Sequence, residues 1–285
     1  MLALGLGCVV YALIEGPAKG WGPTEIGIGI FGVIALVGFI FIELRTAHPM
    51  VPLGVFRSRQ FSGANIVTFG VYGGFGATTF LVVVYLQTRM GYSPIAAGAS
   101  LLPLTAMMLL FSARMGALAQ RIGPRLPMTV GPVVAGAGMA LFSLLEPGVS
   151  YWEGAFPAAM VLAVGLTITV APLTAAVLAA VEDRHAGLSS AINNAVARIG
   201  GLLAIAVLPA LAGIAVGGTG VDLDTGFNTA MYIAGGLSAE GGVVAWFTIR
   251  TAARVRVSTR GDLSIPCEPE CVELPTREPE STNHV

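Results

Sequence analysis

Residues 61–86 read FSGANIVTFGVYGGFGATTFLVVVYL, a run of 26 residues without one charged side chain. As an α-helix such a run is about 39 Å long, whereas about 20 apolar residues suffice to cross the hydrocarbon core of a bilayer. Water is absent from that core, so a crossing segment must satisfy its backbone N–H and C=O groups internally, as a helix does. The stretch therefore predicts a membrane-spanning helix.

The rest of the chain repeats this pattern. Its 285 residues are 55% hydrophobic and 11% charged, with a mean hydropathy of +0.80, whereas about 25% of the residues of a soluble domain are charged. We expect an all-α polytopic membrane protein with about eight transmembrane helices. The predicted helices cover residues 1–14, 25–43, 61–86, 94–117, 127–145, 154–181, 187–216 and 228–249. The first is too short for a full crossing, and we interpret it as truncated at its N-terminus.

The cations gather on one side of these helices. Twelve lie in or beside the connections after the second, fourth and sixth helices and in the segment after the eighth, while the alternate connections hold two, Lys19 and Arg89. Because short loops rich in Arg and Lys stay cytoplasmic, both termini are predicted to be cytoplasmic and the protein to lie in the cell membrane. Residues 251–285 contain few apolar residues and are predicted to be a disordered tail.

Four polar residues recur along the third predicted helix at spacings of 3, 4 and 7: Asn65, Thr68, Tyr72 and Thr79. At about 100° per residue they fall on one face of the helix. Because a polar stripe would be costly against lipid, it should face a water-filled cavity or another helix. Two interpretations stay open, the wall of a solute pathway and hydrogen bonding between helices.

Two other predicted helices carry a charged group far from both of their ends. On the seventh, Arg198 shares a face with Asn194 about three turns in, whereas Asn193 points elsewhere. The predicted role of Asn194 and Arg198 is an anchor at the cytoplasmic end of the helix, and solute contact is the alternative. On the eighth, Glu240 lies well inside an apolar run, as a candidate for proton or cation coupling or as a carboxyl that is neutral or paired within the bundle.

Residues 116–125, GALAQRIGPR, form a short basic turn between the fourth and fifth predicted helices. Gly123 favours a tight turn, and Arg121 and Arg125 can bond helix-end carbonyls or a facing helix. Together with Gly116, they are predicted to form a conformational loop that latches one state of the protein. The alternative is that the basic turn only directs topology.

The sequence shows no enzyme signature. GxSxG, HExxH and phosphate-loop motifs are missing, and His48, His185 and His284 lie scattered in connections and in the tail. Cys267 and Cys271 form a CxxxC without further ligands, which is a poor metal site. We expect no cofactor, no metal and no nucleic-acid partner. Without a nucleotide-binding motif, ATP bound to this chain cannot drive transport.

Several stretches resemble one family in their order along residues 1–250. They are YALIEGPAKGWGP (11–23), HPMVPLGVFRSRQF (48–61), YLQTRMGYSPIAAGASLLP (85–103), GALAQRIGPR (116–125), APLTAAVLAAV (171–181) and AGLSSAINNAVARIGG (186–201). The family is the major facilitator superfamily, in its fourteen-helix drug:proton antiporter branch. The turn 116–125 is similar to the Gly–Asp–Arg–Gly–Arg loop of the superfamily, with Gln120 where Asp is usual, which weakens the charge relay of that loop.

The resemblance implies that the chain is the later part of such an antiporter. Residues 1–60 would be a truncated pair of linker helices with a cytoplasmic loop, 61–250 the C-terminal six-helix bundle and 251–285 the cytoplasmic tail. The third, fourth, sixth and seventh predicted helices would line the central cavity. The missing N-terminal bundle would carry the acids most tied to proton coupling.

The function implied is proton-coupled efflux of drugs or other small amphipathic or cationic compounds, with antibiotic resistance as its effect. The expected partners are the lipid bilayer, a small-molecule solute, protons and the missing N-terminal bundle. A second hypothesis is a transport-inactive membrane fragment, or a half-unit that needs a separately encoded N-terminal bundle.

Overall fold

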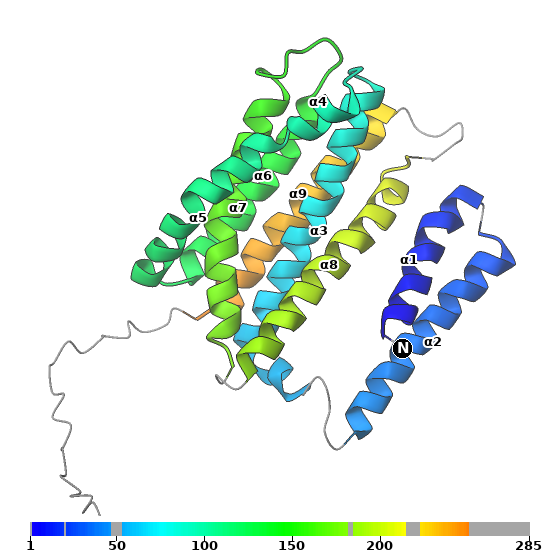
Figure 1. Cartoon of the computed structure of the whole chain (residues 1–285), viewed down its shortest axis with the longest axis vertical. Coiled ribbons are helices and arrows are strands. Elements are labelled where there is room, and N and C mark those ends of the chain that lie inside the picture. The colour runs from blue at the N-terminus through cyan, green and yellow to red at the C-terminus, as the bar shows by residue number, and fades with distance from the viewer. Residues whose placement is uncertain (1, 20, 47–52, 182–184, 215–222, 251–285) are drawn as a thin grey trace, which may run out of the picture. The chain divides into compact units, whose positions relative to one another are not determined.

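The computed structural model describes residues 2–19, 21–46, 53–181, 185–214 and 223–250. These residues form α-helices and two short 3-10 helices, with no strand among them (Figure 1). The elements are α1 (Leu2–Lys19), α2 (Pro23–Arg45), η1 (Leu53–Arg57), α3 (Arg59–Thr88), α4 (Pro94–Ala99), α5 (Leu102–Ile122), α6 (Arg125–Leu141), η2 (Phe142–Leu144), α7 (Ala155–Leu178), α8 (Ala186–Leu211) and α9 (Leu223–Thr248). The predicted tail, 251–285, lies outside the described residues.

Six of the eight predicted crossings are long and apolar enough to span a membrane: α2, α3, α4 with α5, α6 with η2, α7 and α8. The prediction of an all-helical polytopic membrane protein is thereby confirmed. The apolar part of α1 is shorter, Ala3–Gly16. α9 is 26 residues long but is not among the six, because Glu240, together with its glycine and hydroxyl residues, lowers its mean hydropathy. Four of its glycines are buried against neighbouring helices, where small size matters more than apolar bulk.

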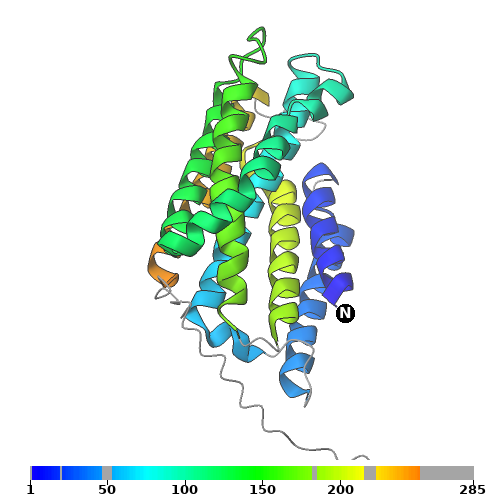
Figure 2. The same cartoon turned by 60° about the vertical axis from the view of Figure 1, so that its left-hand side comes forward.

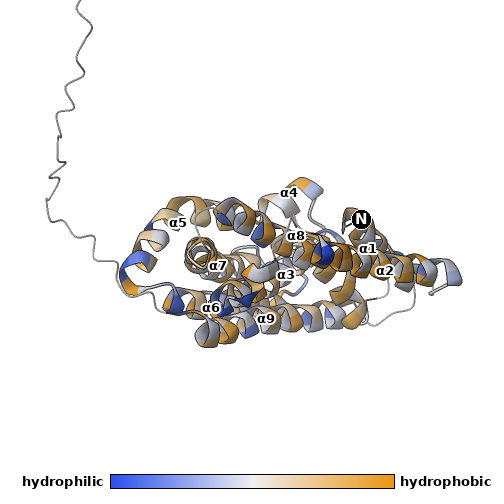
Figure 3. Ribbon diagram, turned by 90° about the horizontal axis from the view of Figure 1, so that it is seen from below, coloured by the Kyte–Doolittle hydropathy of each residue, from blue (hydrophilic) through white to orange (hydrophobic). Residues whose placement is uncertain are grey.

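Helices of the bundle pack in an order that differs from their order in the chain. α5 packs against α7, α7 against α6, α6 against α9, α9 against α3, and α3 against α8. These six helices form an arc whose two ends are α5 and α8, as the end-on view in Figure 3 shows. α7 also contacts α3 and α8. At the N-terminal end of the chain α1 packs along α2 (Figure 2).

Prolines and glycines set several helix ends. The predicted helix 94–117 is broken into α4 and α5 at Ser100–Leu101, just before Pro103, as expected for the residues that precede a proline. Pro172 and Pro209 lie inside α7 and α8, and Pro132 lies inside α6. The predicted helix 187–216 already ends at Leu211, because the nearby Gly213 has a φ of 75°.

Small residues bring the helices of the arc into backbone contact. A Cβ on Gly74 of α3 would lie 2.6 Å from the carbonyl oxygen of Ala234 on α9, and one on Gly70 would lie 2.7 Å from that of Leu237. Between α3 and α8, a Cβ on Gly76 would lie 2.9 Å from the Cα of Gly201. The glycine pair Gly70 and Gly74 therefore packs α3 against α9 within the chain.

An ion pair joins the ends of α3 and α9 on the side predicted to face outward. Nε of Arg89 donates to Oδ1 of Asp224 at 2.8 Å, and a second guanidinium nitrogen pairs with Oδ2. This bond from Arg89 lowers the pKa of Asp224, which precedes the predicted spanning segment 228–249. Beside the pair, the ring of Tyr85 stacks on Phe227 with centroids 4.2 Å apart.

Candidate functional site

The polar stripe of α3 meets α8 through one side chain. Nδ2 of Asn193 donates to Oγ1 of Thr68 at 2.6 Å and to Oδ1 of Asn65 at 3.3 Å. Thr68 is fully buried and Asn65 is 5% exposed. The first two members of the stripe therefore bond a neighbouring helix, which is one of the two interpretations that the sequence leaves open.

The same side chains also bond their own helix. Nδ2 of Asn65 donates to the carbonyl of Phe61 at 2.9 Å, and the Thr68 hydroxyl donates to that of Ala64 at 2.9 Å. Further along, the Thr79 hydroxyl donates to the carbonyl of Phe75 at 2.9 Å. Such bonds to the preceding turn make buried polar residues tolerable in a membrane helix.

Tyr72 and Thr79, the later members of the stripe, are half-buried. The backbone of Tyr72 lies beside α8, where a Cβ on Gly201 would be 3.6 Å from its carbonyl oxygen. Arg198 precedes Gly201 by three residues, about one turn of α8, so Tyr72 and Arg198 lie at similar depth on neighbouring helices. We call these two residues the Tyr72–Arg198 site, beside the contact of α3 with α8.

Arg198 and Asn194 are both exposed, as their shared helix face predicts. Arg198 lies twelve residues after Ala186 and thirteen before Leu211, which is about 18–20 Å from either end of α8 at 1.5 Å per residue. The structure thus puts Arg198 near the middle of α8 rather than at its end. Its anchoring role stays a prediction, with solute contact as the alternative.

Two cavities found among the described residues are not lined by Tyr72 or Arg198. One, of about 320 Å³, is a mainly apolar groove between α3 and α8 that is lined by Ile66, Phe69 and Val196. Asn65 is about 20° and Phe69 about 60° from Tyr72 around α3, so this groove lies one to two turns from Tyr72 on the same side of α3. Ser62 and Asn65 add two polar side chains to the groove.

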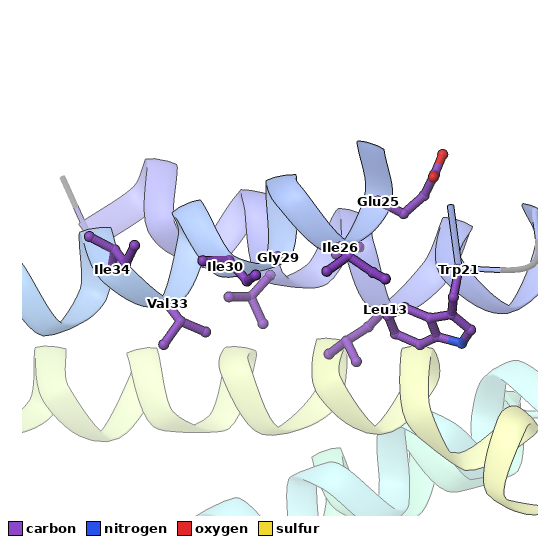
Figure 4. Close-up of a pocket in the computed structure, with 10 residues that line it drawn as sticks. Leu13, Trp21, Glu25, Ile26, Gly29, Ile30, Val33 and Ile34 are labelled. Carbon is purple, nitrogen blue, oxygen red and sulfur yellow. The ribbon is translucent and has the colours of Figure 1, made fainter. Parts of the chain in front are cut away.

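The larger cavity, of about 400 Å³, is a groove along α1 and α2 (Figure 4). Its lining is apolar apart from Glu25 at one end, and Figure 4 shows that carboxylate pointing away from Ile26, Ile30 and Val33. An ideal Cβ on Gly22 would lie 2.8 Å from the Glu25 carboxylate, which is therefore folded toward the start of its own helix. No set of polar groups converges on this groove.

Glu240 is exposed on α9. The neighbouring Gly241 faces α3, and Gly242 faces the carbonyl of Thr129 on α6, so the carboxyl of Glu240 points away from both helices. No partner of Glu240 is found in the described part of the chain. The structure does not bring Glu240 together with the polar stripe of α3.

The predicted conformational loop joins α5 to α6. Gly123 ends α5 with a φ of 87°, and Gly116 lies beside Ala171 of α7. Nε of Arg125 donates to the carbonyl of Trp246 at 3.0 Å, and its guanidinium lies 4.2 Å from the centre of that ring. Arg125 thus ties the start of α6 to the end of α9. Arg121 is exposed and has no such contact among the residues described.

Asn193 is a site residue that the predictions from sequence did not include. It points away from the face of Asn194 and Arg198, as predicted, and that direction is toward α3. The signal was a run of small and polar residues at helical spacing, Ser189, Asn193, Gly200 and Ala204, three of which are buried. No cluster of three metal-ligating side chains is found within the described ranges.

Comparisons with known proteins agree on one family. Residues 1–205 match the family model described as Major Facilitator Superfamily. The chain is 30% identical over 281 residues to the puromycin resistance protein pur8 of Streptomyces alboniger, which covers 93% of this chain and 56% of the relative. It is 31% identical over 223 residues to the tetracenomycin C resistance and export protein of Streptomyces glaucescens, covering 76% and 40%. With the multidrug resistance protein Stp of Mycobacterium tuberculosis it shares 31% identity over 220 residues, covering 73% and 38%. The chain thus spans between 38% and 56% of the length of these relatives.

Proposed function

Because this chain belongs to the Major Facilitator Superfamily, we propose that it is the C-terminal part of a proton-coupled exporter of amphipathic, drug-like compounds. Two of its relatives are named for resistance to puromycin and tetracenomycin C, and a third for multidrug resistance. The order of the motifs along the chain supports the assignment to the C-terminal part. The N-terminal bundle is then the partner that completes the transporter.

The observation that carries the proposal is the Tyr72–Arg198 site. Tyr72 is near the middle of α3 and Arg198 near the middle of α8, and polar groups at that depth need water or a polar partner. Major facilitator transporters bind solutes near the midplane between two bundles that rock against each other. The arc from α5 to α8 supplies one wall of such a cavity, with Tyr72 and Thr79 on it.

Proton influx supplies the driving force, since each charge that crosses the membrane potential gains about 2.3 kcal/mol per 100 mV. The carboxyl of Glu240 lies on α9 and points away from α3, so the proposal assigns the coupling step to acids of the N-terminal bundle. The loop residues Gly116, Arg121, Gly123 and Arg125 act in this scheme at the end of the bundle that moves during rocking.

The test is growth in puromycin and in tetracenomycin C, the compounds for which two relatives are named, of cells that express a full-length transporter ending in this chain. Tyr72→Ala is expected to reduce resistance while the amount of protein in the membrane stays normal. The matched control is Phe80→Ala on the same helix, since Phe80 is 45% exposed and lies on a different face from Tyr72. A protonophore should abolish export by the unmodified protein.

Unchanged resistance with Tyr72→Ala, or equal loss with Phe80→Ala, would remove Tyr72 from the pathway.

The second candidate function is an inactive fragment or a half-unit. It is tested by measuring export from cells that express the chain in three forms: alone, together with a separately encoded N-terminal bundle, and fused to that bundle. Export only when the chain is fused to the N-terminal bundle or expressed together with it would identify the chain as a half-unit that needs that bundle. Absence of export in all three identifies an inactive fragment.

A further inference from the structure

Arg198 is in a position that lipid cannot solvate. It is exposed on α8 and lies about 18–20 Å from either end of that helix, which is several times the reach of an arginine side chain. A guanidinium at that depth is costly unless it faces water, a counter-charge or a polar partner. The exposed face of α8 around Arg198 must therefore face something other than hydrocarbon.

The described part of the chain offers Arg198 no counter-charge. No ion pair or hydrogen bond of its guanidinium is found there, and Tyr72, the residue of α3 beside Gly201 one turn along α8, carries a hydroxyl and no acid group. Glu240, the acid nearest the middle of a helix, is on α9 and points away from α3. The wall formed by α3 and α8 therefore carries an uncompensated positive charge at mid-depth.

The side chains one turn before and one turn after Arg198 indicate what kind of ligand its guanidinium binds. One turn away toward the start of α8 is the exposed amide of Asn194, and one turn away in the other direction is Leu202, which is 48% exposed. A guanidinium presents several N–H donors in a planar fork that fits a carboxylate with two parallel bonds. The Tyr72 hydroxyl can add a donor, and Leu202 can contact an apolar body.

We infer that Arg198, assisted by Tyr72, binds the anionic group of the transported solute, a carboxylate or phenolate on an apolar skeleton. The inference rests on the proposed function and narrows its solute class, since an uncompensated guanidinium repels cations. Amphipathic acids are then favoured over the cationic compounds that the family resemblance also implies. A carboxylate of the N-terminal bundle is the competing counter-charge, and the experiment below separates the two.

The test uses three fluorescent probes that share one apolar body. They are dansylglycine, which is a carboxylate, its neutral amide, and dansylcadaverine, which is a primary ammonium. Binding to the purified 285-residue chain in lipid nanodiscs is measured by fluorescence anisotropy. We expect dansylglycine to bind about tenfold more tightly than the amide, the ratio that one charge-assisted bond provides, and dansylcadaverine to bind most weakly.

Arg198→Gln should remove the preference for dansylglycine, and Arg198→Lys should retain part of it, because an ammonium keeps the charge but not the fork. The matched control is Arg114→Gln, which removes the same charge from α5, where the guanidinium bonds the carbonyl of Leu110 at 3.1 Å. This control should keep the full preference. Thermal unfolding of each variant shows that the chain is folded.

The inference is overturned if the carboxylate and the amide bind equally, if no probe binds saturably, or if the preference survives Arg198→Gln. Each of these results would mean that Arg198 does not bind the anionic group of a solute. The outcome is independent of export by cells. Charge-selective binding without resistance would contradict the proposed function alone, whereas resistance without charge-selective binding would contradict only the role of Arg198.

Discussion

α5 and α8 end the same arc and are similarly unburied, but their exposed faces have opposite chemistry. In the apolar 18-residue stretch of each crossing, buried residues make up 17% for α4 with α5 and 22% for α8, but 56% for α3. Near mid-depth the exposed residues of α5 include Leu109, Leu110 and Phe111, and its exposed Arg114 comes eight residues before the end of the helix. At mid-depth α8 exposes Asn194 and Arg198. In a membrane protein the first surface suits lipid or an apolar neighbour, and the second needs water or a polar partner.

A carboxylate placed on each helix should show the largest difference between them. Leu110 is 62% exposed and lies near the middle of the crossing formed by α4 and α5. Leu110→Asp is expected to cost about 3 kcal/mol, the penalty for Asp at the centre of a membrane helix. Asn194→Asp should cost less than about 1 kcal/mol, because its site is already polar. Thermal unfolding in nanodiscs and the amount of chain in the membrane fraction measure both. Equal losses of stability in Leu110→Asp and Asn194→Asp would mean that the exposed faces of α5 and α8 have the same surroundings.

Separating α8 from α3 is expected to be the next largest effect. A Cβ on Gly200 would lie 2.9 Å from the carbonyl oxygen of Phe69, whereas Gly187 on the same helix has open space around it. Gly200→Leu should lower the free energy of unfolding by about 1–3 kcal/mol through overpacking, and Gly187→Leu should lower it by much less. Chemical unfolding in mild detergent compares them. Since leucine is a better helix former than glycine, a similar loss at Gly187 would mean that overpacking against α3 does not set the cost.

Two adjacent asparagines of α8 distinguish its inner face from its outer face. Asn193 donates two hydrogen bonds to α3, and Asn194 is exposed. Asn193→Ala should cost about 0.6–1.7 kcal/mol, the measured range for hydrogen bonds between membrane helices, and Asn194→Ala should have little effect on stability. The unfolding midpoints of the two variants test this directly. A larger loss for Asn194→Ala than for Asn193→Ala would mean that α8 is rotated about its axis, with Asn194 facing α3.

The smallest effect is expected where charge already lies in water. The Arg89–Asp224 pair is partly exposed, with side chains 37% and 31% accessible, so Asp224→Asn should cost less than about 1 kcal/mol and less still at high salt. Since Arg89 lowers the pKa of Asp224, the stabilisation is present above the unfolded-state pKa of about 3.9 and fades as the pH falls below it. Unfolding measured between pH 3 and pH 7 with and without salt checks both statements.

Much of the fold could be predicted from the sequence because lipid imposes simple rules. Runs such as 61–86 must be helices, and α3 extends only two residues beyond each predicted end. The spacing of Asn65 and Thr68 likewise predicted a shared polar face. Local sequence does not reveal which helices become neighbours, however, and α3 packs against α8 and α9, far along the chain. The bond from Asn193, and the site that Arg198 forms with Tyr72, depend on that arrangement and could not be derived from spacing alone.

The central claim is that the exposed face of α8 faces water while that of α5 does not. Cysteine reactivity tests it, after Cys8, Cys267 and Cys271 are replaced by serine and Asn194→Cys or Leu110→Cys is added. Vesicles open to reagent on both sides are treated with 2-sulfonatoethyl methanethiosulfonate, which is charged and stays in water, and with N-ethylmaleimide for normalisation. We predict that the cysteine at 194 reacts at least tenfold faster with the sulfonate reagent than the cysteine at 110. Equally slow reaction at both positions would contradict a water-filled face on α8.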